Sequence, residues 1–122
     1  MRILVVDDDP VAGEMVLAVL EGLGHEAQLV ENGVEALAAV DSQPDFGMII
    51  SDMNMPLLSG IDLFRELREQ KNAIPFILLT GDEPAGPLAR EPRLDACLVK
   101  DFTLDESLPA IMSEVLARPG HS

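Results

Sequence analysis

Aromatic residues are scarce in this sequence of 122 residues, which contains four phenylalanines and no tryptophan or tyrosine. Flavin sites and single-stranded nucleic-acid platforms usually stack their ligands on aromatic faces, so the composition argues against both. Basic residues are also few, with eight lysines and arginines against 22 acidic residues and a net charge of −14. Such a surface should repel nucleic acid, because contacts to phosphates need a basic stripe.

Cysteine and long apolar runs are the other two shortages. Cys97 is the sole cysteine, so it cannot form an internal disulfide and has no partners for a zinc site; we interpret it as a small core residue. No apolar run approaches 18 residues, and three aspartates follow Val6 too early for a signal-peptide core. We therefore expect a soluble cytoplasmic protein.

Hydrophobic residues make up 48% of the chain, which is enough for one compact domain with a real core. Five short apolar runs alternate with segments of helical spacing, and they cover residues 3–6, 27–30, 48–50, 75–79 and 97–99. This alternation with short links predicts an α/β fold, a parallel sheet with helices on both faces. The second run is the least apolar, which is consistent with an edge strand.

Capping signals place the first three helices. Asp9 before Pro10 is typical of a helix start, and Gly24 suits the left-handed residue after a helix end. The pattern from Asn32 to Glu35 predicts a second start, and Ser59 predicts a third.

The last two helices are harder to place. Residues 82–96 contain three prolines, so we expect any fourth helix to be short, late or broken. The stripe that begins at Leu108 predicts a fifth helix, but Pro109 limits where it can begin. Ser107 as N-cap would place the proline safely, and a capping box at residues 103–106 is the rival start.

Polar residues stand where four of the expected strands end. Asp7 and Asp8 follow the first strand, Asp52 ends the third, Thr80 the fourth and Lys100 the fifth. The carboxyl ends of parallel strands meet at one sheet edge, where ligands bind in open α/β sheets. Asp52 alone could equally be a turn residue. Polar residues at the ends of four strands are harder to explain by coincidence than a polar residue at the end of one, so we expect a functional site at this edge.

Converging carboxylates repel one another, and a divalent cation would relieve that repulsion. Oxygen ligands suit Mg²⁺, whereas zinc is disfavoured because no histidine or cysteine lies in the cluster. Lys100 could pair with Asp52 or bind a phosphate oxygen, and Thr80 would add a hydroxyl. These parts suit a carboxylate nucleophile that accepts a phosphoryl group. A purely structural Asp–Lys ion pair is the alternative.

Four segments of the chain resemble motifs of the receiver domain of two-component response regulators, both in their order and in the distances between them. They are residues 3–8, residues 52–56 with Gly60, Thr80, and Lys100 with Phe102. The resemblance covers nearly the whole chain. It implies a single doubly wound (βα)5 domain over residues 1–117, with strand order 2-1-3-4-5 and an irregular fourth helix. Residues 118–122 would then be a tail or the start of a linker.

The resemblance also implies a function. Asp52 would take a phosphoryl group from a histidine kinase or phosphotransfer protein and switch contacts with a downstream effector. Asp7, Asp8 and Asp52 with the Asn54 carbonyl would hold Mg²⁺, for which Mn²⁺ could substitute. Thr80 would be the switch hydroxyl, and Lys100 would contact the phosphoryl group. Such a domain catalyses only its own phosphorylation and dephosphorylation, binds no nucleic acid or membrane directly, and has no oligomeric state that the sequence specifies.

Several positions depart from the usual receiver pattern. In receiver domains a proline usually follows the lysine, and the peptide bond between them is typically cis; here that position is Asp101. A cis bond before a residue other than proline costs about 2.5–4 kcal/mol. We therefore predict a trans Lys100–Asp101 bond. Asp101 could also weaken phosphoryl retention. Cys97 replaces the usual aromatic switch residue, and Gly81 replaces a small alanine or serine.

Two other functions compete with a phospho-acceptor. A pseudo-receiver that acts as a binding module without phosphorylation is favoured by the departures at Asp101, Cys97 and residues 82–96. A phosphatase of the haloacid-dehalogenase type also uses an aspartate nucleophile after a strand, but it needs a second aspartate where this chain has Asn54.

Overall fold

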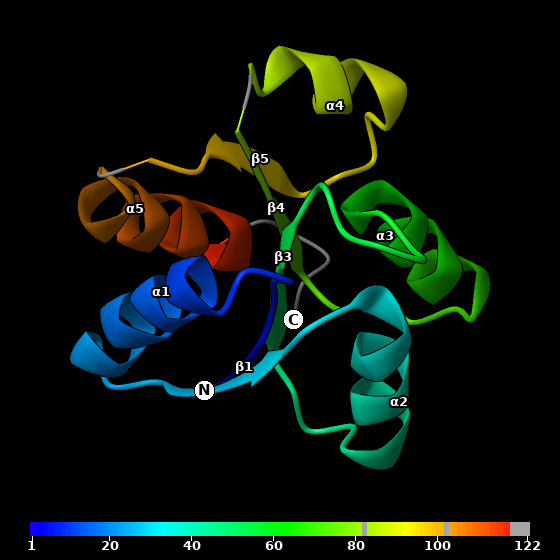
Figure 1. Cartoon of the computed structure of the whole chain (residues 1–122), viewed down its shortest axis with the longest axis horizontal. Coiled ribbons are helices and arrows are strands. Elements are labelled where there is room, and N and C mark those ends of the chain that lie inside the picture. Colours follow the sequence, from blue (N-terminus) through cyan, green and yellow to red (C-terminus); the bar gives the residue numbers. More distant parts are fainter. Residues whose placement is uncertain (82, 102, 118–122) are drawn as a thin grey trace.

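The computed structural model describes residues 1–81, 83–101 and 103–117. Strands and helices alternate along them as β1 (Arg2–Val6), α1 (Pro10–Gly22), β2 (Glu26–Val30), α2 (Gly33–Ser42), β3 (Met48–Asp52), α3 (Gly60–Glu69), β4 (Phe76–Thr80), α4 (Ala85–Arg90), β5 (Ala96–Val99) and α5 (Leu104–Ala117). The strands form one parallel sheet in the order β2-β1-β3-β4-β5 (Figure 1). The predicted fold class and strand order are confirmed.

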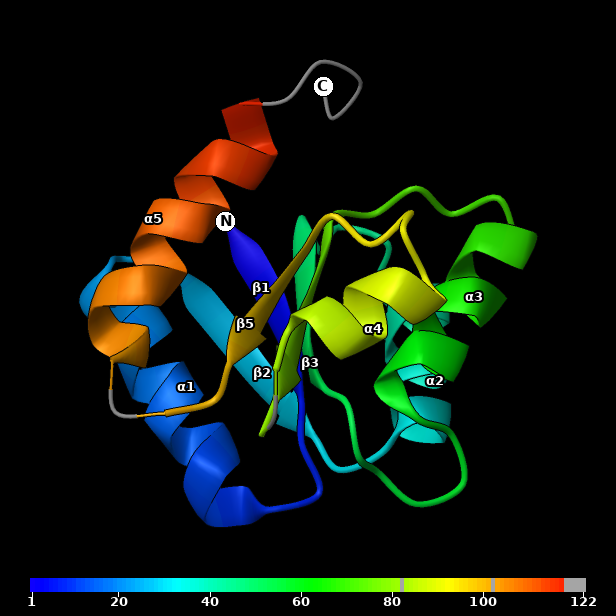
Figure 2. The ribbon, with the colours of Figure 1, turned by 90° about the horizontal axis from the view of Figure 1, so that it is seen from above.

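Helices cover both faces of the sheet. Helices α1 and α5 lie on one face and α2 and α3 on the other, while α4 lies beside β5 (Figures 1 and 2). Successive residues of a strand point to opposite faces, so Ile3 and Val5 join the core under α1 and α5, whereas Leu4 and Val6 join the core under α2 and α3. Two separate cores therefore clamp the central strands between them.

The first three helices begin where the capping signals predict. The Asp9 carboxylate accepts a hydrogen bond from the Val11 amide at 3.0 Å, and Asn32 Oδ1 accepts one from the Glu35 amide at 2.8 Å. The Ser59 hydroxyl oxygen accepts the Asp62 amide at 3.2 Å. Each contact satisfies an amide that the first helical turn leaves unpaired. Gly24 has a φ of +89°, the left-handed conformation expected after a helix end.

Helix α4 has six residues and its Pro84 cap makes no side-chain hydrogen bond, so the prediction of a short fourth helix is confirmed. Helix α5 begins at Leu104, which makes the Ser107 start wrong. Leu104 is 2% exposed in the core under α1 and α5, and burying it extends the helix by a turn. Pro109 therefore lies inside α5, where it has no N–H to donate to the carbonyl of Asp105 one turn earlier.

Acidic side chains after α4 bind arginines of α3. Glu91 is 5% exposed and accepts hydrogen bonds from Arg65 at 3.0 Å and from Arg93 at 2.8 Å. These hydrogen bonds, that of Arg93 above all, lower the pKa of Glu91 to about 2 although burial opposes them. Asp95 bonds Arg68 at 3.1 Å and accepts the Phe76 amide at 2.8 Å. The segment between α4 and β5 is thus fixed to α3 by buried charges.

Backbone geometry is regular at the Lys100–Asp101 bond, whereas two exposed residues, Leu57 and Lys71, have a positive φ. All peptide bonds between described residues are trans, so the Lys100–Asp101 prediction is confirmed. Leu57, between β3 and α3, has a φ of +71° and an 82% exposed side chain. None of the helices in the described ranges is long and apolar enough to span a membrane. The expected tail at 118–122 and the motif residue Phe102 lie outside the described residues.

Candidate functional site

The register of the parallel strands brings the predicted site residues to one edge of the sheet. Val6 pairs with Ser51, so Asp7 follows β1 beside Asp52 at the end of β3. On the other side, Thr80 ends β4 and pairs with Val99, and the Lys100 amide donates to the Thr80 carbonyl at 2.7 Å. The sequence prediction that these strand ends meet is therefore confirmed for Asp7, Asp52, Thr80 and Lys100.

Three carboxylates converge at this edge. Asp7, Asp8 and Asp52 each offer one oxygen, and these oxygens lie within 4.8 Å of one another. Asp7 is 2% exposed and Asp52 9%, whereas Asp8 is exposed. Asp7 Oδ1 accepts a hydrogen bond from the Asp9 amide at 2.9 Å, which fixes the orientation of this carboxylate. The cluster therefore has a buried base and one solvent-facing member.

Lys100 reaches into the carboxylate cluster. Its Nζ lies 2.7 Å from Asp7 Oδ2 and 3.4 Å from Asp52 Oδ1. The sequence suggested Asp52 or a phosphate oxygen as its partner, and the structure adds Asp7 as the closer one. One ammonium group thus bridges the two buried carboxylates and neutralises part of their charge.

The charges around Asp52 explain its protonation behaviour. Burial raises the pKa of Asp52 above its ordinary value; the neighbouring charge of Lys100 lowers it, and Asp7 and Asp8 raise it again. Burial alone would lower the pKa of Lys100, but its hydrogen bond to Asp7 and the charge of Asp52 outweigh burial and raise it. Lys100 therefore stays charged, and a further cation would relieve the repulsion that Asp52 still feels.

The donor set fits a hard divalent cation. All the converging atoms are carboxylate oxygens, and oxygens on opposite sides of an octahedral Mg²⁺ lie roughly 4 Å apart, so a spread of up to 4.8 Å needs only a small adjustment. Asp8, being exposed, leaves one side of the cluster open for water or phosphate ligands. The residues present thus suit Mg²⁺ or Mn²⁺ better than zinc.

Gly60, at the start of α3, is packed directly under Asp52. A Cβ atom at this position would lie 2.5 Å from the Asp52 carbonyl oxygen and 2.4 Å from Leu78 Cδ1. The Gly60 amide also donates to the Met53 carbonyl at 2.9 Å. In the sequence, Gly60 stands only as part of the receiver motif. The structure gives the reason for glycine: only a residue without a side chain lets α3 approach the end of β3 this closely.

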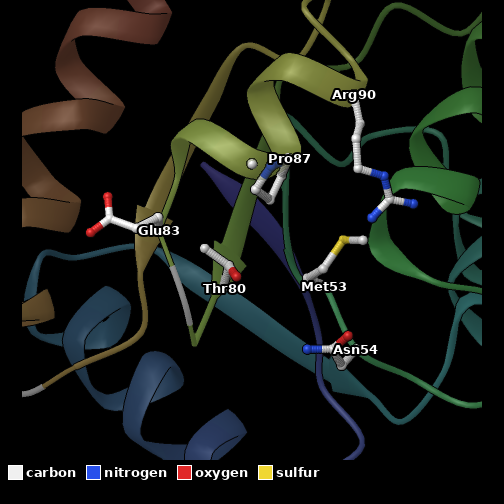
Figure 3. A pocket seen from close by; sticks show the side chains of 7 residues that line it. Met53, Asn54, Thr80, Glu83, Pro87 and Arg90 are labelled. Carbon is white, nitrogen blue, oxygen red and sulfur yellow. The ribbon is translucent and has the colours of Figure 1, made fainter.

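A cavity of about 390 Å³ opens next to the carboxylates, between the end of β4 and α4. Figure 3 shows the side chains around it, with Arg90 and Glu83 at opposite ends. Its lining residues are Met53, Asn54, Thr80, Glu83, Gly86, Pro87 and Arg90. Sequence reasoning missed Met53, Pro87 and Arg90 as site neighbours, because nothing in the local pattern shows where the short α4 will lie.

Two departures from the receiver pattern have structural partners. The Asp101 carboxylate accepts hydrogen bonds from the amide and the hydroxyl of Thr103 at 2.8 and 2.6 Å, and these bonds lower its pKa. It thus closes the turn before α5. Cys97 is 9% exposed in the core under α2 and α3, and burial raises the pKa of its thiol to about 11. This placement confirms the interpretation of Cys97 as a core residue.

The family model described as the response regulator receiver domain matches residues 3–112. The chain belongs to this family. This receiver domain is 33% identical to the response regulator TrrA from Thermotoga maritima, crystallised in complex with Mg²⁺-BeF; the match has a TM-score of 0.85 and covers 94% of this chain and 98% of that one. A CheY4 chemotaxis protein from Vibrio cholerae matches with a TM-score of 0.83, 31% identity and coverage of 94% and 98%.

Curated relatives of this receiver domain include larger proteins. The DNA-binding response regulator MtrA from Mycolicibacterium smegmatis is 34% identical over 93% of this chain and 50% of its own length. The sensor histidine kinase RcsC from Escherichia coli is 35% identical over 86% of this chain and 11% of its own length. The chain therefore spans half or less of these two relatives, and it matches both a regulator and a kinase.

Proposed function

We propose that this receiver domain accepts a phosphoryl group on Asp52 from the phosphohistidine of a histidine kinase or phosphotransfer protein. The observation that carries the proposal is Lys100, whose ammonium lies 2.7 Å from Asp7 and 3.4 Å from Asp52 inside a cluster of three carboxylates. A lone structural ion pair would need one carboxylate. Three carboxylates around one lysine leave negative charge that an incoming cation and phosphoryl group can use.

The proposed reaction is an in-line displacement at phosphorus. An Asp52 carboxylate oxygen forms a bond to phosphorus while the bond from phosphorus to the donor's imidazole nitrogen breaks, and the imidazole leaves with the electron pair. Asp7, Asp8, Asp52 and the Asn54 carbonyl would hold Mg²⁺, which would supply charge neutralisation at the phosphoryl oxygens. Lys100 orients and neutralises a further oxygen, and the Thr80 hydroxyl donates to another. Later, a water oxygen forms a bond to phosphorus while the bond from phosphorus to the Asp52 oxygen breaks, which releases inorganic phosphate and restores the Asp52 carboxylate.

Phosphorylation would then change contacts with an effector. We propose that residues 1–117 form the signalling unit, that it acts in the cytoplasm, and that residues 118–122 are a tail or the start of a linker. In both MtrA and RcsC, the segment that matches this chain is joined to further residues of the same protein. The effector of this domain is therefore either a domain of the same protein or a separate partner.

The test is phosphorylation by a small donor. The purified domain, incubated with acetyl phosphate and Mg²⁺, should gain the mass of one phosphoryl group, and Asp52→Asn should gain none. Asp41→Asn, which changes an exposed aspartate on α2, should behave like the wild type. If the wild type stays unmodified with acetyl phosphate and with a phosphorylated phosphotransfer protein, the acceptor proposal fails and the binding-module alternative replaces it.

A further inference from the structure

The cavity beside the carboxylate cluster has an apolar floor and charged side chains at its rim. Met53 is 7% exposed and Pro87 is buried, and together they form an apolar floor. Glu83 and Arg90 lie at opposite ends of the rim, and the Glu83 carboxylate points away from Arg90 (Figure 3). The Arg90 end therefore combines an apolar surface with a positive charge.

Among the basic residues, Arg90 differs from most because its guanidinium forms no ion pair with an acidic side chain that the structure describes. The ion-paired ones are Arg2, Arg65, Arg68, Arg93 and Lys100. Within the described residues, no acidic side chain forms an ion pair with Arg90 or Lys71, and Arg90 lines the cavity. What holds Arg90 in place is its backbone, since its carbonyl accepts a hydrogen bond from Arg65 at 3.2 Å.

We propose that this cavity receives a glutamate side chain of a partner protein, with its carboxylate on Arg90 and its methylenes on Met53 and Pro87. Charge complementarity selects the occupant: the guanidinium offers paired donors that match a carboxylate. The proposal goes beyond phosphoryl transfer and stands without it, because Arg90, Met53 and Pro87 take no part in that chemistry.

Two features favour a side chain on a protein over a free small molecule. Asn54, Glu83, Gly86 and Arg90 are exposed, so the cavity is open along much of its rim. Small-molecule sites usually bury 70–90% of their ligand, which this rim does not allow. A glutamate that is tethered to a docked partner needs less enclosure, because the other contacts of the partner hold it at high effective concentration.

The cavity lies close to the proposed phosphorylation site, so binding of a partner glutamate there should depend on the state of that site. Thr80 and Asn54 line the cavity; the Thr80 carbonyl accepts the Lys100 amide at 2.7 Å, and Asn54 follows Asp52 by two residues. A partner glutamate on Arg90 would therefore lie against the same strand end and loop that a phosphoryl group on Asp52 would contact. Its affinity should respond to any change at Thr80.

The test uses the intact domain with its methionine methyl groups and backbone amides labelled for NMR. The probe is a blocked pentapeptide with a central glutamate between glycines, and the control is the same peptide with glutamine. The glutamate peptide should shift the Met53 methyl and Gly86 amide signals saturably, with a dissociation constant on the order of millimolar. The methyl signals of Met15 and Met48, which do not line the cavity, should stay in place.

Variants assign the effect to Arg90. Arg90→Gln should weaken binding about tenfold, because a charge-assisted contact is lost, whereas Arg90→Lys should keep part of the affinity. Glu83→Gln removes a repelling charge and should strengthen binding about twofold. Lys71→Gln, a matched loss of positive charge elsewhere on the surface, should change nothing.

Three results would overturn the proposal. The first is equal binding of the glutamate and glutamine peptides, or no binding of either. The second is unchanged affinity in Arg90→Gln with an unchanged melting temperature. The third is glutarate binding at least tenfold more tightly than the peptide, which would make the cavity a site for a free dicarboxylate instead.

Discussion

The Lys100 ammonium donates a hydrogen bond to Asp7 across 2.7 Å, although the two residues stand 93 positions apart in the chain. Asp7 is 2% exposed, so this carboxylate depends on Lys100 for its neutralisation. Asp52 lies farther from the same ammonium, at 3.4 Å. Lys100 therefore binds Asp7 more closely than Asp52.

Replacing Lys100 with methionine should lower the free energy of unfolding of the metal-free domain by about 2–3 kcal/mol, because two buried carboxylates lose their cation. Urea denaturation measures this change. Lys71→Met, which changes a solvent-exposed lysine, should cost little. Adding Asp7→Asn to Lys100→Met should restore part of the loss, and strictly additive effects of the two changes would contradict the coupling.

Magnesium should stabilise the domain through the carboxylate cluster. At a concentration about one hundred times its dissociation constant, Mg²⁺ should raise the free energy of unfolding by about 2.7 kcal/mol, and Mn²⁺ should act similarly. Thermal denaturation with and without the ion measures the effect. Asp8→Asn should remove most of it while leaving metal-free stability nearly unchanged, because Asp8 is exposed. An unchanged melting temperature of the wild type in both ions would speak against a metal site.

Gly60→Ala should destabilise the domain by about 2–3 kcal/mol, because the new Cβ would lie 2.5 Å from the Asp52 carbonyl oxygen. The backbone has to shift there, so Mg²⁺ affinity should fall as well. Gly22→Ala is the matched control: nothing lies within 4 Å of a Cβ at Gly22, near the end of α1, and this change should stabilise by about 0.5–1 kcal/mol. Equal effects of the two changes would disprove the steric role of Gly60.

Because of Glu91, the free energy of unfolding should depend on pH at values below about 4.5. The folded pKa of about 2 lies below the ordinary glutamate value of about 4.3, so the contribution of Glu91 is present above pH 4.3 and is lost as the pH falls through about 2. Glu91→Gln should therefore cost about 1.5–3 kcal/mol at pH 7 and progressively less toward pH 2.

Urea denaturation at pH 7, 4.5 and 3 follows this trend. Glu14→Gln changes an exposed glutamate of α1 and should track the wild type throughout. A cost of Glu91→Gln that stays constant across this pH range would show that the two arginines do not act through the charge of Glu91.

Local signals in the sequence were sufficient for most of the fold. Strand length and alternation depend on neighbouring residues, and so do the caps at Asp9, Asn32 and Ser59; each was predicted and each appears in the structure. The convergence of Asp7 and Asp52 was also predictable, because parallel strands bring their carboxyl ends to one edge.

Features that depend on packing between distant elements were not predictable in this way. The sequence alone does not decide between the two possible starts of α5, because the deciding factor is the burial of Leu104 in a core that the local pattern does not describe. The binding of Glu91 by Arg65 and Arg93 was missed for the same reason, as was the cavity at Arg90. In each case residues far apart in the chain meet only after the sheet has formed.

The hydrogen bond between Asp7 and Lys100 also constrains when the site can assemble. Asp7 follows β1 and Lys100 follows β5, with the other strands between them in the chain. During synthesis from the amino terminus, the ribosome releases the carboxylates long before the lysine that neutralises them. A nascent chain that stops before β5 therefore lacks this lysine, and the last strand to emerge completes the sheet and neutralises part of the charge at its edge.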